Sequence, residues 1–160
     1  MNRRIYAAFA FAMPLLLASP SPAAAPFKAY TFGTMKFTVS APTNWGSLER
    51  TVKKTKFKFD KIGQFTVTRK YKAKNLNDLA ANMRAKESTG VWKVRKEARL
   101  KIGGNNALMM VLKLKAKVRM VYYFINTKNG IYSLAFANFK RKYKKQKGIY
   151  HAVALSFRAL

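Results

Sequence analysis

The sequence of 160 residues contains no cysteine, which removes disulfide bonds and thiolate chemistry from any account of its structure or function. Zinc ribbons, iron–sulfur clusters and a lipid-modified amino-terminal cysteine are excluded for the same reason. The single histidine, His151, excludes histidine-rich metal sites as well. We therefore expect neither a bound metal nor a cofactor.

Acidic residues are also scarce. Five Asp+Glu stand against 33 Lys+Arg, which gives a formal net charge of +28 at pH 7 and a pI near 10.8. Ordinary domains carry charges of both signs. Because 49% of the residues are apolar, the composition is nevertheless that of a folded protein rather than a disordered tail. The excess of positive charge predicts a polyanionic partner.

The residues that most enzymes use for covalent or acid–base catalysis are nearly absent. A Ser-His-Asp triad would need His151, which we expect to be structural or at the surface, and no Gly-x-Ser-x-Gly motif exposes a serine. Its carboxylate would have to come from Glu49, Asp60, Asp78, Glu87 or Glu97. Glu87 and Glu97 have basic neighbours and are better explained as salt-bridge partners than as a glycosidase pair. The Gly103-Gly104 pair lacks the Lys-Ser/Thr of a phosphate-binding P-loop. We expect no enzymatic activity.

The amino-terminal apolar stretch is too short to form a permanent membrane-spanning helix. Ile5–Leu17 has 13 residues, contains Pro14 and follows the basic pair Arg3 and Arg4, whereas a spanning helix needs about 20 residues. A basic start, a short apolar stretch and a small-residue end are typical of a cleaved secretory signal peptide, with a retained anchor as the alternative. We expect the protein to be periplasmic or secreted.

Two positions satisfy the small-residue rule for signal cleavage. Cleavage after Ala25 would leave Pro26 just beyond the cut, where we expect it to be disfavoured, so we predict cleavage after Ala23. Residues 1–23 then form the signal peptide, and residues 24–160 form one domain that keeps a strong excess of basic residues. No linker, repeat or composition break divides this domain.

Alternating apolar and polar residues predict three strands in the first part of this domain. Met35–Ala41 alternates with a period of two, and Pro42 ends the pattern. Thr55–Phe59 and Phe65–Arg69 alternate again on either side of the turn residues Asp60–Gly63. We interpret this pair as a β-hairpin.

The period then changes to that of a helix. Leu76–Met83 carries apolar residues at positions i, i+3, i+4 and i+7. Asn75 or Asn77 can serve as the N-cap, and Gly90 can close the other end. The segment predicts a helix of about three turns.

Four strands are predicted after this helix. Val91–Leu100 alternates, and the Gly103–Asn106 segment forms a turn. Ala107–Thr127 is too long for one strand, so we divide it near Lys115–Val118. Asn129-Gly130 predicts a type I′ hairpin turn, in which both central residues need positive φ.

The last strand and a closing helix complete the predicted order. Ile131–Ala137 is the strand, and Ile149–Phe157 has apolar residues at close to helical spacing. The order is βββ-α-ββββ-α. The expected fold class is therefore α+β, with an antiparallel sheet of about six to seven strands flanked by two helices.

Five segments resemble the PsbP-like family, named for an extrinsic subunit of photosystem II. They are FTVSAPTNW (Phe37–Trp45), LNDLAANM in the predicted helix, IGGNNALMM at the glycine turn, GIYSLAFA (Gly130–Ala137) and VALSFR near the end. The resemblance implies an antiparallel sheet flanked by helices in an exported domain that acts as a binding or assembly factor. This chain departs from the family in its basicity. It has no histidine or carboxylate cluster that matches a metal site of the photosynthetic members, so neither a metal nor a photosystem function is carried over.

Basic residues are concentrated in alternating strands and in one continuous segment. From Ala98 to Leu160 there is no acidic residue. Lysines alternate with apolar residues in two predicted strands, so we expect a cationic sheet face if those strands share a sheet. The segment Phe139–Lys147 is a second cluster, in a connection or first helical turn before the closing helix. The predicted polyanion-binding residues are Lys56, Lys58, Lys113, Lys115, Lys117, Arg119, Lys140, Arg141, Lys142, Lys144, Lys145 and Lys147.

The expected function is that of an exported, non-enzymatic binding protein whose basic surface binds an anionic envelope component or an acidic partner protein. Phosphates of lipopolysaccharide, anionic lipid headgroups and wall polymers are the abundant candidates outside the cytoplasm, and nucleic acid is less available there. The main alternative is an accessory or assembly factor that docks on a protein by shape, with incidental basicity. A membrane-disrupting toxin would need an exposed basic helix, but residues 152–160 are mostly apolar. Adaptation of the charge to an acidic or salty environment also remains open.

Overall fold

A computed structural model describes residues 26–46, 48–51, 54–58, 63–70, 75–114 and 117–160. The expected signal peptide and Lys115 lie outside these residues, as does most of the turn predicted at Asp60–Gly63.

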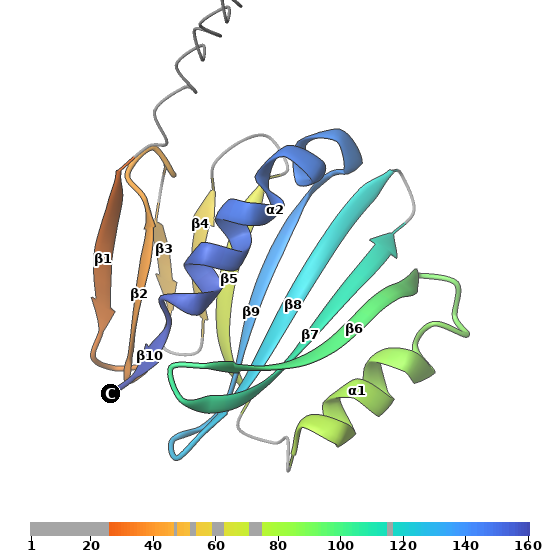
Figure 1. Ribbon diagram of the computed structural model, residues 1–160, viewed down its shortest axis with the longest axis horizontal. Helices are drawn as coiled ribbons and strands as arrows, with labels where there is room; N and C mark the ends of the chain where they lie inside the picture. The colour runs from red at the N-terminus through yellow and green to blue at the C-terminus, as the bar shows by residue number, and fades with distance from the viewer. Residues whose placement is uncertain (1–25, 47, 52–53, 59–62, 71–74, 115–116) are drawn as a thin grey trace, which may run out of the picture.

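The described strands form two antiparallel sheets (Figure 1). The seven-stranded sheet has the order β3 (Leu48–Thr51), β4 (Lys54–Lys58), β5 (Gln64–Lys70), β9 (Gly130–Phe139), β8 (Val118–Thr127), β7 (Asn105–Leu114) and β6 (Trp92–Ile102). The three-stranded sheet has the order β1 (Phe27–Phe32), β2 (Phe37–Pro42) and β10 (Arg158–Ala159). The helices are α1 (Leu76–Ala85) and α2 (Lys140–Leu155).

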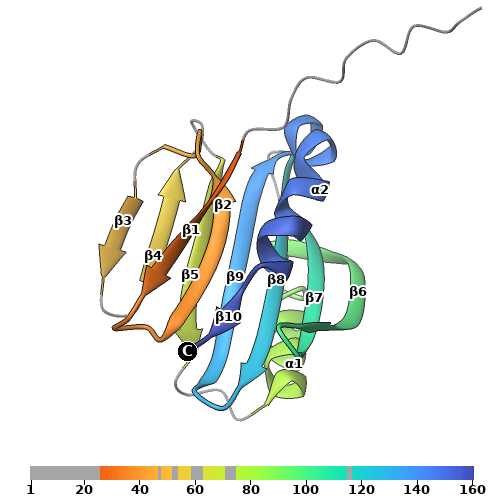
Figure 2. The same ribbon diagram turned by 60° about the vertical axis from the view of Figure 1, so that its left-hand side comes forward.

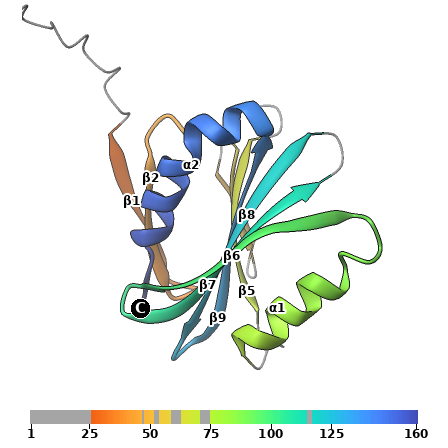
Figure 3. The ribbon, with the colours of Figure 1, turned by 45° about the vertical axis from the view of Figure 1, so that its right-hand side comes forward.

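The two helices pack on opposite faces of the seven-stranded sheet (Figure 3). Successive side chains of a strand point to opposite faces of the sheet, so each face of β8 contributes to a different core. Tyr123 belongs to the core beneath α2, and Phe124 belongs to the core beneath α1. The three-stranded sheet lies beside α2 on the same side of the large sheet (Figure 2). It is joined there by the Tyr132 hydroxyl, which donates to the Met35 carbonyl at 2.6 Å. Both faces of the large sheet are therefore partly covered.

The predicted fold class and the second half of the predicted order are confirmed. The first helix begins at Leu76, and the Asn75 side chain caps it by accepting from the Asp78 N–H at 2.8 Å. Four strands and a helix follow, and the long apolar run divides between Leu114 and Val118. The local pattern was sufficient here because each of these strands carries apolar residues that pack in a core, although the bulge in β6 puts Val94 on the α1 side and Leu100 on the α2 side.

The prediction of three strands before α1 was incomplete, since the structure has five. β1 was missed because it is largely exposed and has no clean alternation. β3 is only four residues long and carries the polar sequence LERT. The two-residue β10 is too short to give a pattern.

The turn between β8 and β9 differs from the predicted type I′ turn. Its two loop residues are Lys128 and Asn129, because Thr127 pairs with Gly130. Positive φ occurs at Gly130 (105°) and not at Asn129. The Thr127 hydroxyl stabilises the loop instead, since it accepts from the Asn129 N–H at 3.1 Å and donates to the Gly130 carbonyl at 2.8 Å.

The closing helix starts earlier than predicted, at Lys140 rather than Ile149. The basic segment therefore forms the first half of α2 and is not a connection. Its first turns show no apolar period because their side chains are solvent-exposed, yet Lys, Arg and Gln are good helix formers. The predicted helical residue Phe157 lies beyond α2, just before β10.

The core is dominated by aromatic contacts across β5, β9 and α2. The Phe136 ring stacks on Phe65, with centroids 4.4 Å apart and planes at 7°. Its other neighbours include Tyr150, with centroids 5.0 Å apart, and Trp45, at 6.2 Å. Phe136 is fully buried and Trp45 is 6% exposed, so both are core residues.

We expect Phe136→Ala and Trp45→Ala each to lower the free energy of unfolding by about 3–5 kcal/mol, the usual cost of removing a buried aromatic side chain. The exposed Leu155 provides the control, since Leu155→Ala should change stability by under about 0.5 kcal/mol. Urea denaturation measures all three. A loss below about 1 kcal/mol for Phe136→Ala would contradict its position in the stack.

Candidate anion-binding site

Three cations stand in a row across neighbouring strands of the large sheet. Lys93 of β6 pairs with Lys113 of β7, and Lys113 pairs with Arg119 of β8. The row lies on the face covered by α2, because Val111, two residues before Lys113 on β7, packs against the core beneath α2. Like charges directly opposite one another destabilise a sheet. This arrangement therefore has an electrostatic cost that a bound anion would offset.

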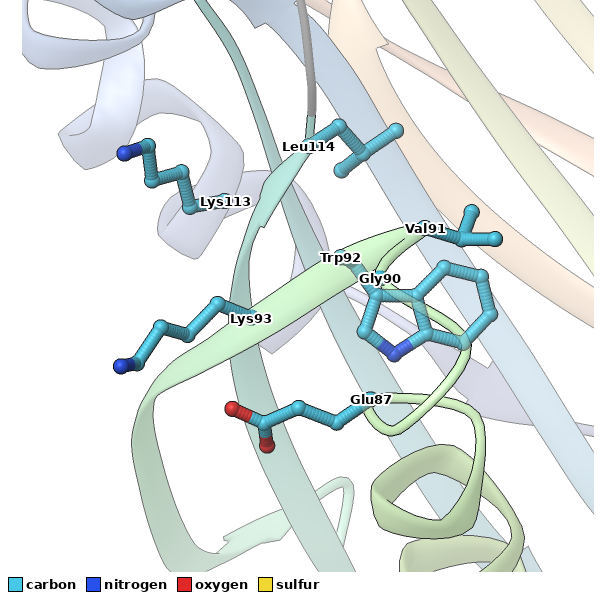
Figure 4. Close-up of a pocket in the computed structure, with 7 residues that line it drawn as sticks. All are labelled: Glu87, Gly90, Val91, Trp92, Lys93, Lys113 and Leu114. Atoms are coloured by element: carbon cyan, nitrogen blue, oxygen red, sulfur yellow. The ribbon is translucent and has the colours of Figure 1, made fainter.

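Two members of the row, Lys93 and Lys113, line a pocket at the edge of the sheet (Figure 4). It has a volume of about 450 Å³ and is lined by Glu87, Gly90, Val91, Trp92, Lys93, Lys113 and Leu114. The Lys93 and Lys113 side chains extend together on one side of the strands, away from the Trp92 and Leu114 side chains (Figure 4). The Glu87 carboxylate reaches toward the Lys93 side of this edge strand. Lys113 and Arg119, the inner members of the row, lie farther from the edge.

The carboxylates whose side chains are described lie at or near α1. Asp78 is in its first turn, Glu87 follows its last turn, and Glu97 pairs with Arg84 of α1 at 2.5 Å. Glu97 projects from the sheet face that α1 covers, since its partner is Met110, a residue of the core beneath α1. The carboxylates with described side chains therefore lie near α1, whereas the first half of α2 contains cations and no carboxylate.

The start of α2 brings a second group of cations to the same place. The Lys140 N–H donates to the Lys117 carbonyl at 2.8 Å, which ties the first turn of α2 to the β7–β8 turn. Lys117 has φ 61°, a left-handed conformation that a side chain rarely adopts without a constraint. Arg119 of β8 pairs with Asn138 of β9, and Asn138 lies two residues before Lys140, the first residue of α2. The row and the helix start are therefore neighbours.

The helix start itself is electrostatically unfavourable. Its first turn contains no acidic residue, and Phe139 at the N-cap makes no side-chain cap hydrogen bond. Cations at a helix N-terminus oppose the helix dipole and lose about 0.3–1 kcal/mol each compared with a favourable placement. We call the combined set the α2 cationic surface. It consists of Lys93, Lys113, Lys117, Arg119, Lys140, Arg141, Lys142, Lys144, Lys145 and Lys147.

A groove runs from this surface along the sheet, between α2 and strands β6–β8. Its volume is about 530 Å³, and most of its wall is apolar. The lining residues are Lys96, Met109, Val111, Tyr123, Tyr143, Lys147, Gly148 and His151. The Tyr123 hydroxyl and the His151 Nδ1 atom are hydrogen-bonded at 3.2 Å.

The two tyrosines of the groove are neutral at pH 7. Burial raises the pKa of the Tyr123 hydroxyl well above its ordinary value, and Tyr143 adds to the rise. Burial also raises the pKa of Tyr143, against the opposing effect of the Arg119 guanidinium. Arg119, the third member of the cationic row, therefore acts electrostatically on a residue that lines the groove.

The structure brings together most of the predicted binding residues, but it separates Lys56 from them. Lys56 pairs with Thr66, and the same register leads through Ala135 to Tyr122, which packs with the core beneath α1. The side chain of Lys58 lies outside the described part of the chain. The prediction of one cationic sheet face shared by all the lysines was therefore wrong, because Lys56 and Lys113 belong to opposite faces.

Lys93 and Lys96 were missed as candidates. A register shift between Val94 and Lys96 puts both lysines on the face toward α2, although three residues apart in a regular strand would place them on opposite faces. The basic sequence around them, KVRKEARLK, was a visible signal. The bulge that directs both side chains to one face was not.

Two further features are absent from the described part of the chain. No group of three or more His, Asp or Glu residues there could hold a metal ion. None of the helices there is long and apolar enough to cross a membrane.

Comparisons with known proteins give a likeness of structure. No family model matches the sequence, and no curated protein matches it. The solution structure of cyanobacterial PsbP (CyanoP) from Synechocystis sp. PCC 6803 superposes with a TM-score of 0.65 at 12% identity, covering 92% of this chain and 99% of that one. A Pseudomonas aeruginosa protein of unknown function, PA94, described as a putative regulator, gives a TM-score of 0.56 at 11% identity, covering 81% and 94%. The chain has a PsbP-like fold.

Proposed function

We propose that this chain is an exported, non-enzymatic binding protein that captures an anionic component of the cell envelope, or an acidic partner, through the α2 cationic surface. The observation that carries the proposal is the backbone hydrogen bond from Lys140 to Lys117, which joins two cationic segments at one place. A concentrated positive potential accelerates the capture of polyanions and raises their local concentration.

The electrostatic cost of the surface supports a binding role. A row of like charges across three strands and cations at a helix N-terminus both reduce stability. Solubility alone does not require either arrangement, since the same lysines scattered over the surface would keep the protein soluble at lower cost. Binding sites commonly retain such unfavourable arrangements because a ligand offsets them.

Lysine dominates the surface, and this favours phosphate attraction without a fixed geometry. Only Arg119 and Arg141 among its ten members have the planar guanidinium suited to bidentate recognition. The partner we favour is therefore a repeated or clustered anion, such as the phosphates of lipopolysaccharide, lipid headgroups or a wall polymer.

The export part of the proposal comes from the amino-terminal sequence, with its basic start, short apolar stretch and small-residue end. An accessory factor that docks by shape is the second candidate, and the likeness to cyanobacterial PsbP favours it. The two candidates differ in their response to salt, because only the electrostatic mechanism releases condensed counterions.

Lys113 is the central member of the cationic row, so its reversal should separate stability from binding. We expect Lys113→Glu to raise the free energy of unfolding by about 0.5–1 kcal/mol, because it replaces two repulsive cross-strand pairs by attractive ones. The same change should weaken heparin binding roughly tenfold, which is the loss of affinity expected when one charge-assisted hydrogen bond is removed. Urea denaturation and a binding titration measure the two effects.

The matched control for this substitution is Lys101→Glu. Lys101 is exposed on the neighbouring strand β6, and its cross-strand partner is Asn106, so no cationic pair is relieved. It should change stability by under about 0.5 kcal/mol and affinity by less than Lys113→Glu does. Equal effects of the two reversals on affinity would contradict a localised site.

Neutralising the first half of α2 tests whether the helix forms part of the site. We expect the variant with Lys140, Arg141, Lys142, Lys144 and Lys145 changed to Gln to bind anionic phosphatidylglycerol vesicles more weakly. Its log affinity should also depend less steeply on log salt, because fewer counterions are released. Vesicle sedimentation at several salt concentrations measures both quantities.

The control removes five exposed charges elsewhere, by changing Lys28, Lys36, Lys86, Lys101 and Lys128 to Gln. It should lose less affinity and less of the salt slope than the α2 variant. If both variants lose equally, net charge alone attracts the vesicle. Salt-independent binding by the native protein would favour docking by shape.

A further inference from the structure

The groove beside α2 exposes apolar side chains in the middle of a sheet face. Met109 and Val111 of β7 are only half-buried there, although their neighbours on the same face are covered by α2. The exposure of such residues to water is unfavourable by about 25 cal/mol per Å². The groove's volume of about 530 Å³ is within the range of small-molecule sites, roughly 300–1,000 Å³.

Gly148 forms part of the wall that α2 contributes to the groove. Gly148 lies within the helix, and a Cβ added there would meet no heavy atom within 4 Å. Glycine in a helix interior reduces stability by about 0.5–1 kcal/mol compared with alanine. Packing therefore does not demand glycine at this position, and a longer side chain there would occupy part of the groove that Met109 and Val111 also line.

Cations line this apolar space and continue beyond one end. Lys96 and Lys147 lie at its walls, contributed by β6 and α2. On β7, Lys113 follows Val111 on the same face, and Arg119 is its cross-strand partner. No carboxylate lines the groove. The site thus changes from apolar to cationic along its length.

We propose that the groove holds the hydrocarbon chain of a single-chain amphiphile whose phosphate headgroup is bound by Lys113, Arg119 and Lys147. The headgroup part rests on the proposed function of the α2 cationic surface, and the chain part rests on the groove itself. Charge complementarity selects an anionic headgroup, because cations line the groove and no carboxylate does. The neutral Tyr123 and Tyr143 hydroxyls leave the wall without negative charge at pH 7.

Binding of three probes tests the combination of chain and charge. They are oleoyl lysophosphatidic acid below its aggregation concentration, oleoyl lysophosphatidylcholine with the same chain, and glycerol 3-phosphate with no chain. We expect lysophosphatidic acid to bind at least about tenfold more tightly than glycerol 3-phosphate, since burial of two methylene groups alone gives such a factor. It should also bind more tightly than lysophosphatidylcholine, whose zwitterionic headgroup has no net negative charge to pair with the cations, and equal affinity for these two lipids would contradict the headgroup site. Equal affinity for lysophosphatidic acid and glycerol 3-phosphate would overturn the proposal.

Gly148→Leu blocks the groove without changing charge. It should reduce affinity for lysophosphatidic acid at least about tenfold, because the leucine side chain would keep two or more methylene groups of the lipid chain out of the groove. Its affinity for heparin should stay unchanged, and its melting temperature should not fall because leucine favours the helix. Gly148→Ala is the matched control, because it also removes the entropic cost of ordering glycine in a helix but adds only a Cβ atom to the groove. Unchanged lysophosphatidic acid binding by Gly148→Leu would overturn the proposal.

A measurement on the native protein does not depend on any variant. Met109 lines the groove, whereas the adjacent Met110 faces the core beneath α1. Lysophosphatidic acid should shift the methyl NMR signal of Met109 and leave that of Met110 in place, and glycerol 3-phosphate should shift neither. A Met109 signal unaffected by saturating lysophosphatidic acid would contradict the groove. If heparin does not bind but the lipid still shifts Met109, the proposed function fails while the groove proposal stands.

Discussion

A stack of aromatic rings anchors α2 on the large sheet, and the position of every cation on the helix depends on it. Phe136 of β9 lies between Phe65 of β5 and Tyr150 of α2, at centroid distances of 4.4 and 5.0 Å. The buried Asn138 adds direction, because its amide donates to Gln146 and to the Tyr150 hydroxyl. This network lies beneath the middle of the helix, at Gln146 and Tyr150, while the Lys140–Lys117 hydrogen bond holds the helix start beside the β7–β8 turn.

The core therefore opposes the repulsion between surface charges. Burial of a large aromatic side chain contributes several kcal/mol, whereas each misplaced cation at a helix terminus or in a cross-strand row costs under about 1 kcal/mol. A PsbP-like fold with such a core can tolerate a cationic surface that would destabilise a weaker one. The molecule is thus a scaffold with an electrostatically unfavourable surface and an open groove beside it, the two features on which the proposed binding of an anion rests.

The cation clusters could be predicted from the sequence because each is local, whereas their arrangement in space depends on strand pairing and could not. The cations of Lys113–Arg119 and of Lys140–Lys147 were predicted because each cluster is continuous in the sequence. Their meeting was not predicted, since it depends on the pairing of β8 with β9 and on the contact between Lys140 and Lys117. Alternation correctly placed Lys56 on one face of its strand, but it could not say which face was shared with β7. The open groove has no sequence signal apart from Gly148, which resembles any other helix glycine.

Hydrogen exchange of backbone amides in the native protein tests the central claim most directly, namely that an anion relieves the charge repulsion at the start of α2. Heparin should increase protection of the amides in the first turns of α2, where cations oppose the helix dipole, and leave those of α1 unchanged. The expected result is a slowing confined to α2 and the adjoining strand β8. Equal slowing in α1 and α2, or no slowing in α2 while heparin is bound, would contradict the account.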